Sequence, residues 1–163
     1  MKFSTLKRRT LSETIGWVLA TWFGSGCAPK APGTVGSFCS LPLVAIGLLG
    51  GQSTLLITAG ILFVVGWWAT AVVLHTQSKH DPGFIVIDET VGQTLTFALV
   101  IGQPVSLTIL LAGFLLFRFF DIVKLWPASY FDKNVCNAFG VMMDDVMAGM
   151  YAALILYGFT FII

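Results

Sequence analysis

Long apolar runs separated by short polar breaks constrain this chain more than any other feature of its sequence. Apolar segments extend over about 36–50, 54–76, 85–102, 105–126 and 138–163. The longer ones reach the roughly 20 residues that a helix needs to cross a bilayer. Because backbone polar groups in a bilayer must be paired inside the protein, helices are the expected structure. The sequence therefore predicts an all-α integral membrane protein, a compact bundle of about four to five membrane helices.

Composition supports this class and excludes others. Hydrophobic residues make up 56% of the 163 residues and charged residues only 10%, far from the usage of soluble domains. The net charge of +1 gives no basic excess that would favour a nucleic-acid partner. Three cysteines without metal-type spacing make a disulfide framework or a zinc site improbable. The length fits one domain over 1–163, and the sequence carries no signal for an oligomeric state.

The N-terminal region predicts a helix that lies on the membrane rather than across it. A Thr10-x-x-Glu13 capping-box pattern precedes apolar residues at helical spacing. This stretch is too short to span a bilayer, and the basic residues before it suit anionic headgroups. No signal-type apolar core follows the basic start, so we expect the N-terminus to be retained. We predict an interfacial helix within 1–23, a glycine/proline loop over 24–37 and the helical bundle over 38–163.

The basic residues predict which side of the membrane each break faces. Lysines and arginines gather at the N-terminus and in the breaks "HTQSKHDPG" and "WPASYFDKN", whereas "GLLGGQS" and "IGQP" contain none. The positive-inside rule makes the basic side cytoplasmic and leaves the C-terminus outside. The first and third segments are short, so either is a candidate for a tilted, broken or re-entrant segment.

Five carboxylates from three different segments are predicted to lie at one depth, the cytoplasmic edge of the hydrocarbon. A carboxylate near the bilayer costs a few kcal/mol or more unless it has a partner, so such groups are functional candidates. Adjacent acids project about 100° apart on a helix. One member of each pair can therefore face the bundle interior while the other takes a supporting or metal-bridging position. An all-oxygen set suits Mg²⁺ or Mn²⁺. The five acids are Asp88, Glu89, Asp121, Asp144 and Asp145.

Two further features leave alternatives open. Arg118, Asp121 and Lys124 are spaced three residues apart, which fits either a structural ion-pair ladder on one helix face or a functional site. The stretch "GSGCAPKAPGTVGS", with Lys30, Thr34 and Ser37, could hold a phosphate or be a simple re-entrant linker. It lacks the spacing of an ATP-type P-loop.

Four blocks of the chain resemble the phosphatidylglycerophosphatase A family of membrane phosphatases. They are "APGTVGS" (31–37), "HDPGFIVIDETVGQ" (80–93), "FRFFDIVKLWP" (117–127) and "FDKNVCNAFGVMMDD" (131–145). They occur in family order and cover nearly the whole chain. The resemblance implies a Mg²⁺-dependent phosphomonoesterase that converts phosphatidylglycerol phosphate to phosphatidylglycerol. It also implies a site at the inner face of the bacterial cytoplasmic membrane.

The resemblance and the acid pattern together suggest roles for these residues. Asp88, Glu89, Asp144 and Asp145 would hold Mg²⁺, with Asp121 as a further ligand or the base that orients water. The cations that would bind the phosphate are Lys30, Arg118 and Lys124, and the hydroxyl donors are Thr34 and Ser37.

Two rival classes remain on sequence grounds. An ion-coupled transporter also uses intramembrane carboxylates, but it predicts acids near the midplane and an internal repeat, and we find neither in the sequence. A non-catalytic scaffold would use the same charges as structural pairs.

Overall fold

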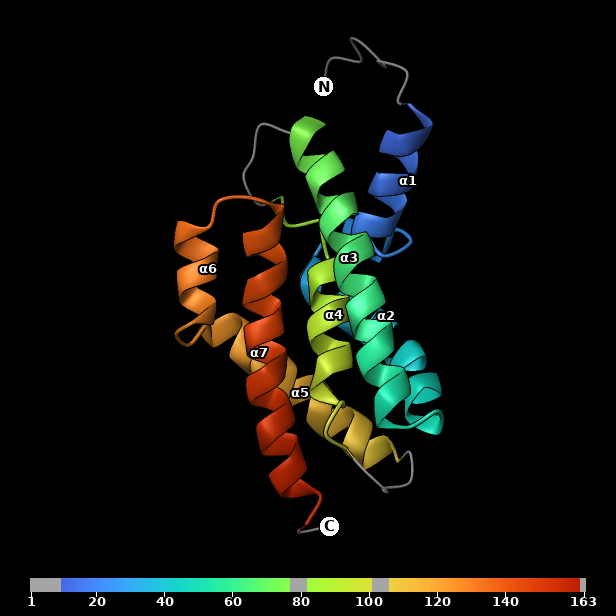
Figure 1. Cartoon of the computed structure of the whole chain (residues 1–163), viewed down its shortest axis with the longest axis vertical. Helices are drawn as coiled ribbons and strands as arrows, with labels where there is room; N and C mark the ends of the chain where they lie inside the picture. Colours follow the sequence, from blue (N-terminus) through green and yellow to red (C-terminus); the bar gives the residue numbers. More distant parts are fainter. Residues whose placement is uncertain (1–9, 77–81, 101–105, 162–163) are drawn as a thin grey trace.

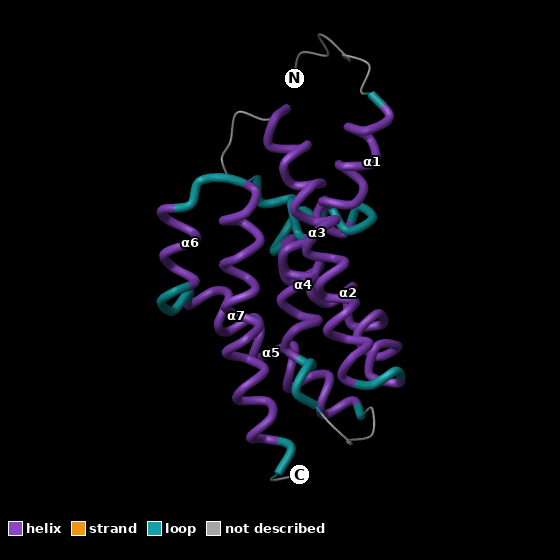
Figure 2. Tube along the Cα trace, viewed as in Figure 1, coloured by secondary structure: helices purple, strands orange, loops and turns teal. Residues whose placement is uncertain are grey.

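The computed structural model describes residues 10–76, 82–100 and 106–161, and within these ranges every regular element is a helix (Figure 2). The all-α class predicted from the sequence is therefore confirmed. The elements are α1 (Leu11–Ala20), the short 3₁₀ helix η1 (Ser25–Cys27), α2 (Pro32–Leu49), α3 (Gln52–Thr76), α4 (Ile87–Thr96), α5 (Leu107–Val123), α6 (Ala128–Asn134) and α7 (Ala138–Phe159).

The long helices run alternately up and down the long axis of the molecule, with α4 at their centre (Figure 1). The start of α7 and the end of α3 lie at the upper end, where α1 and α6 also lie, and α7 ends at the opposite end. The breaks at "HTQSKHDPG" and "IGQP", which the topology prediction used, lie partly or wholly outside the described residues.

Among the described helices, α2, α3 and α7 are long and apolar enough to cross a membrane. Their outer faces agree with that role, since α3 exposes Ile57, Ile61 and Val64 at helical spacing. In lipid such side chains need no protein partner. α5, with 17 residues, is nearly as long, and it crosses behind α7 (Figure 1).

The third apolar segment, predicted over 85–102 and expected to be short, forms a helix of only 10 residues. α4 is buried among α2, α3, α5 and α7, so its polar turns are shielded by protein rather than exposed to lipid. Eight of its residues are buried, among them Asp88 and Gln93. α4 therefore carries polar groups into the centre of the bundle.

The capping box predicted at the start of α1 is present. Thr10 Oγ1 accepts a hydrogen bond from the Glu13 N–H, and the Glu13 carboxylate accepts one from the Thr10 N–H. α1 packs closely on α3, because a Cβ on Gly16 would clash with Val72. Its position at a membrane surface stays a prediction.

The loop predicted over 24–37 is wrong in its second half. α2 begins at Pro32, so residues 32–37 form its first turns and α2 reaches 18 residues. Proline is favoured at the first helical position because its missing N–H would have no intrahelical partner there. The first apolar segment is thus longer than its hydrophobic run indicated.

The break "WPASYFDKN" contains an unpredicted helix, α6. α5 ends at Val123 because Lys124 takes the left-handed conformation (φ 48°) at its C-cap. The chain then turns into α6, which packs beside the start of α7, with the rings of Phe131 and Phe139 6.3 Å apart. The predicted segment 105–126 is therefore too long at its end.

Candidate active site

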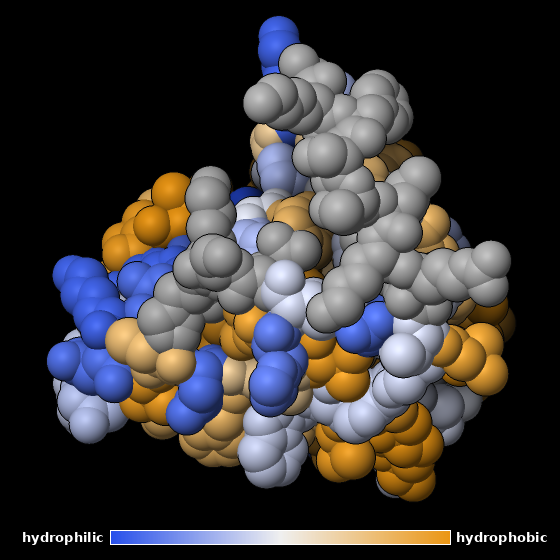
Figure 3. All heavy atoms as spheres, turned by 90° about the horizontal axis from the view of Figure 1, so that it is seen from above, coloured by the Kyte–Doolittle hydropathy of each residue, from blue (hydrophilic) through white to orange (hydrophobic). Residues whose placement is uncertain are grey.

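All five predicted acids line one cavity of about 230 Å³ near the upper end of the bundle. They come from the first turn of α4, the last turn of α5 and the second turn of α7. Viewed onto that end, hydrophilic side chains gather on the side where Figure 1 places α6, next to apolar residues (Figure 3). The other lining residues are Gly83, Ile85, Lys124, Asp132, Val135, Cys136 and Val141.

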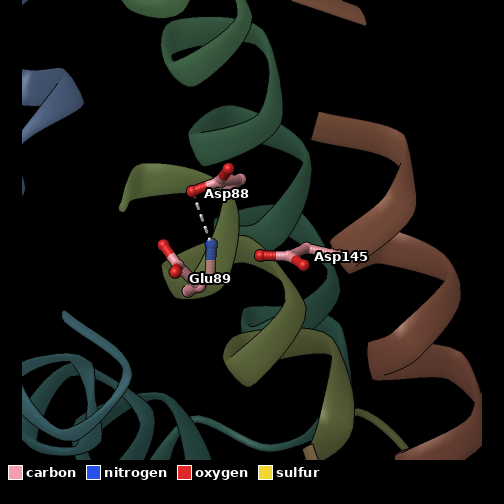
Figure 4. Close-up of side chains that lie close together, drawn as sticks. All are labelled: Asp88, Glu89 and Asp145. Atoms are coloured by element: carbon pink, nitrogen blue, oxygen red, sulfur yellow. Dashed lines mark hydrogen bonds between the residues drawn. The ribbon is translucent and has the colours of Figure 1, made fainter. Parts of the chain in front are cut away.

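Asp88, Glu89 and Asp145 form the tightest group, which we call the acid triad. Each offers one carboxylate oxygen, and these oxygens all lie within 4.8 Å of one another. Asp145 extends from α7 toward the start of α4, where the other two lie (Figure 4). Asp88 and Asp145 are only 8% and 4% exposed. Three carboxylates this close, two of them on buried residues and one on a partly buried residue, need a countercharge.

The start of α4 favours this placement of acids. Asp88 and Glu89 lie in its first turn, where the helix dipole and unpaired N–H groups stabilise negative charge. Asp88 Oδ1 accepts a hydrogen bond of 3.0 Å from the Glu89 N–H. Two helices can therefore present three carboxylates without any loop residue.

A glycine contact one turn further along brings α4 and α7 together. A Cβ on Gly149 would clash with the carbonyl oxygen of Gly92, and a Cβ on Gly92 would clash with Phe117 and the Asp145 carbonyl. Gly149 lies four residues after Asp145, and Gly92 four after Asp88. The two glycines therefore allow α4 and α7 to approach closely one turn beyond the acid triad.

The acid triad fits a hard divalent cation. Its ligands are all carboxylate oxygens, which Mg²⁺ prefers. Glu89 Oε2 is buried and has no hydrogen-bond partner among the described residues. One turn further along α4, Gln93 is fully buried, and neither of its amide atoms is hydrogen-bonded in the described part of the chain. Buried polar atoms without partners are rare in proteins, and Glu89 Oε2 belongs to the candidate cation site itself.

Asp144, the fourth predicted metal ligand, has different neighbours from the acid triad. Its Oδ2 accepts a hydrogen bond of 2.6 Å from Lys124 Nζ, and its Oδ1 accepts one of 3.0 Å from the Asp145 N–H. The group of acids close enough to share a cation therefore contains Asp145 but not Asp144 among the described residues.

The three charged residues spaced along the end of α5, Arg118, Asp121 and Lys124, form two separate groups of ion pairs. Arg118 Nη1 lies 2.5 Å from Asp121 Oδ2 and 3.8 Å from Glu89 Oε1. Lys124 forms its ion pairs with Asp144 and with Asp132 of α6, at 2.6 and 2.5 Å. Arg118 and Asp121 therefore form the ion pair that their spacing allows, whereas Lys124 connects α5 to the two elements that follow it.

The neighbouring carboxylates of Asp144 and Asp132 stabilise the charged form of Lys124. Its burial opposes the charged form, but Asp144 and Asp132 outweigh that effect and raise the pKa of the Lys124 ammonium well above its ordinary value. Lys124 is thus a fixed positive charge at the wall of the cavity, and it is suited to bind an anion rather than to donate a proton.

The predicted phosphate loop lies partly apart from the cavity. Ser37 is fully buried, donates to the Gly33 carbonyl at 2.8 Å and accepts a hydrogen bond from Arg118 at 3.4 Å. Lys30 is exposed, and neither it nor Thr34 is among the lining residues that the structure describes. The first turn of α2 still approaches the site, because a Cβ on Gly33 would clash with Glu89 Oε1.

Sequence reasoning missed Asp132, which lines the cavity and pairs with Lys124. Asp132 lies in a polar break, where an acid needs no special explanation, and most residues of "ASYFDKN" have low helix propensity, so α6 has no strong signal in the sequence.

Comparisons with known proteins agree with the resemblance of the four blocks. Residues 18–160 match the family described as Phosphatidylglycerophosphatase A. A Haemophilus influenzae protein with that name is 39% identical over 158 residues, which cover 96% of this chain and 94% of the relative. An Escherichia coli protein with the same name is 36% identical, covering 86% of this chain and 80% of the relative.

A third relative carries a different name. A Bacteroides thetaiotaomicron protein with the provisional name phosphatidylinositol-3-phosphatase is 37% identical, over 85% of this chain and 89% of the relative. No solved structure matches the chain.

Proposed function

The chain belongs to the phosphatidylglycerophosphatase A family, and from this premise we propose that it hydrolyses phosphatidylglycerol phosphate to phosphatidylglycerol and inorganic phosphate. The observation that carries the proposal is the convergence of five acids and a lysine on one cavity. In the reaction, the oxygen of water forms a bond to phosphorus, and the bond from phosphorus to the lipid glycerol oxygen breaks. That oxygen leaves with a proton.

We propose Mg²⁺ as the cofactor, held by Asp88, Glu89 and Asp145. A bound divalent cation offsets negative charge on the phosphoryl group. Lys124 contributes a second positive charge at the same cavity. Asp121 is the proposed group that orients the water, because Arg118 holds its carboxylate at the cavity wall. Asp144 accepts a hydrogen bond from Lys124 and another from the Asp145 N–H, so it would support the metal site from beside the acid triad.

The depth of the acids supports a phosphatase over a transporter. Lys124 lies at the C-cap of α5, and Asp88 and Glu89 lie in the first turn of α4, so these parts of the cavity are at helix ends. The proposal puts the cavity at the depth of a lipid headgroup, whereas a transport site is expected at the midplane.

Purified protein in detergent tests the activity. With phosphatidylglycerol phosphate and Mg²⁺, phosphate release is expected, and EDTA should stop it until Mg²⁺ is restored. The same assay with phosphatidylinositol 3-phosphate addresses the name of the third relative. Faster turnover of that lipid would move the proposal to another headgroup but keep lipid phosphomonoester hydrolysis. Ion flux into liposomes without phosphate release would favour the transporter.

We propose that the cavity faces the cytoplasm in the inner membrane, where the product enters phospholipid biosynthesis. The distribution of basic residues supports this orientation. Cysteine labelling in a background without Cys27, Cys39 and Cys136 tests it. A cysteine at Lys133 should be protected from an impermeant reagent added outside, and one at Gly51 should react. The opposite pattern would reverse the orientation.

A further inference from the structure

Lys124 connects three separate elements through its ammonium group. The lysine caps the end of α5, Asp132 lies on α6 and Asp144 lies on α7. Both carboxylates approach Lys124 Nζ within 2.6 Å. We call these three side chains the lysine clamp.

The left-handed backbone at Lys124 indicates that its side chain is needed there. Its φ of 48° is a conformation that glycine or asparagine usually takes after a helix, because a Cβ there is strained. Non-glycine residues in this region are associated with functional sites. Since the side chain ends at the cavity wall, the strain is consistent with a need for charge at that place.

Stability alone accounts poorly for the Asp132 contact. The side chains of Lys124 and Asp132 are 28% and 31% exposed, and ion pairs with this access to solvent contribute little to stability. Asp144, which is only 9% exposed, already supplies a buried partner. Asp132 therefore adds little to the fold but does fix the direction of the ammonium.

An ammonium group has three donors. Asp132 and Asp144 each accept one from Lys124, so with respect to the described residues one donor is left for a ligand in the cavity. We propose that Asp132 is a positioning residue, which holds Lys124 so that its third donor binds the phosphate of the substrate. α6 is then part of the active site. This inference rests on the proposed phosphatase function.

The direction in which KM changes in Asp132→Asn distinguishes a positioning role of Asp132 from a simple effect of its negative charge. Asp132→Asn removes a negative charge, and by charge alone it should strengthen the binding of an anionic lipid and lower KM. Positioning predicts the opposite, a KM about tenfold higher with kcat and the Mg²⁺ requirement within about twofold of wild type. Asp132→Glu should recover most of the loss. Lys133→Gln is the matched control, since it changes the charge of the same helix without touching the clamp, and it should stay within about twofold.

If Asp132 acts by positioning Lys124, the change in KM caused by Asp132→Asn requires that Lys124 be present. In a Lys124→Met background, Asp132→Asn should change KM by less than about twofold. An unchanged or lower KM in the single Asp132→Asn variant, or an equal loss in both backgrounds, overturns the proposal.

Side-chain mobility separates failure of this inference from failure of the proposed function. If wild-type protein releases no phosphate from the lipid, the proposed function fails, but the clamp remains testable without substrate. Asp132→Asn should then increase the mobility of the Lys124 side chain, measured by NMR relaxation of isotope-labelled lysine, several-fold relative to Lys133→Gln. Equal Lys124 mobility in the two variants overturns the positioning role.

Discussion

The acid triad and the lysine clamp share one cavity but are held in different ways. Asp88 and Asp145 of the triad are buried, and the helices that carry the triad, α4 and α7, meet in close backbone contact at Gly92 and Gly149. The clamp is partly exposed and depends on side-chain ion pairs between three elements. The first arrangement is sensitive to volume and the second to charge, so variants of the two should fail in different ways.

The largest expected effect follows from removing a carboxylate of the triad. Asp145→Asn, Asp88→Asn or Glu89→Gln should lower turnover about 10- to 100-fold or more, because loss of a metal ligand or its supporting partner has effects of that size. Phosphate release measures turnover, and calorimetric titration with Mg²⁺ should show weaker binding. Glu13→Gln, which lies in α1, is the control and should keep wild-type turnover. Near wild-type turnover in all three triad variants would place the site elsewhere.

The next effect tests whether backbone contact sets the triad. Gly149→Ala should push α7 from α4, lowering stability by about 1–3 kcal/mol, the usual range for overpacking, and weakening Mg²⁺ binding. Gly158→Ala is a matched control in the same helix, since a Cβ there meets no atom within 4 Å. Thermal unfolding in detergent measures the stability of each variant, and calorimetric titration measures its Mg²⁺ binding. Equal behaviour of the two alanine variants would show that the contact does not set the spacing.

Asp121 belongs to neither the acid triad nor the lysine clamp, but it lines the same cavity and forms an ion pair with Arg118. If it orients the water, Asp121→Asn should depress kcat much more than stability, since it removes an interaction needed in the transition state. A structural ladder would give the reverse, a lower Tm with normal turnover of the folded fraction. We expect the first outcome, and parallel measurements of kcat and Tm distinguish the two.

The smallest effect concerns the charge of the clamp. The raised pKa of Lys124 means that its ion pairs stabilise the fold fully below the unfolded lysine pKa of about 10.4 and are lost only as pH rises through the higher folded value. Between pH 7 and 10, Lys124→Arg should therefore leave the shape of the kcat/KM profile unchanged. A limb in the wild-type profile that disappears in the arginine variant would show that Lys124 loses its proton in this range.

Helical periodicity and hydropathy were enough to predict the class of the protein and the gathering of its acids at one level. Apolar length identified the long helices, and the capping box of Thr10 and Glu13 located the start of α1. The positions of Asp88, Asp121 and Asp145 within their segments predicted a common level, which the shared cavity bears out. These features depend on residues near one another in the chain, so local patterns record them.

The partners of each acid depended on tertiary structure. Asp144 and Asp145 are adjacent in sequence, yet Asp144 faces Lys124 while Asp145 joins the triad. Asp132 enters the site only because α6 forms and turns back toward α5. Periodicity fixes which face of a helix a residue occupies, but the neighbour that meets this face is set by long-range packing, such as the contact of Gly92 with Gly149. The sequence by itself therefore determined a membrane helix bundle with acids at one level, and tertiary packing decided which acids could share a cation and which hold the lysine.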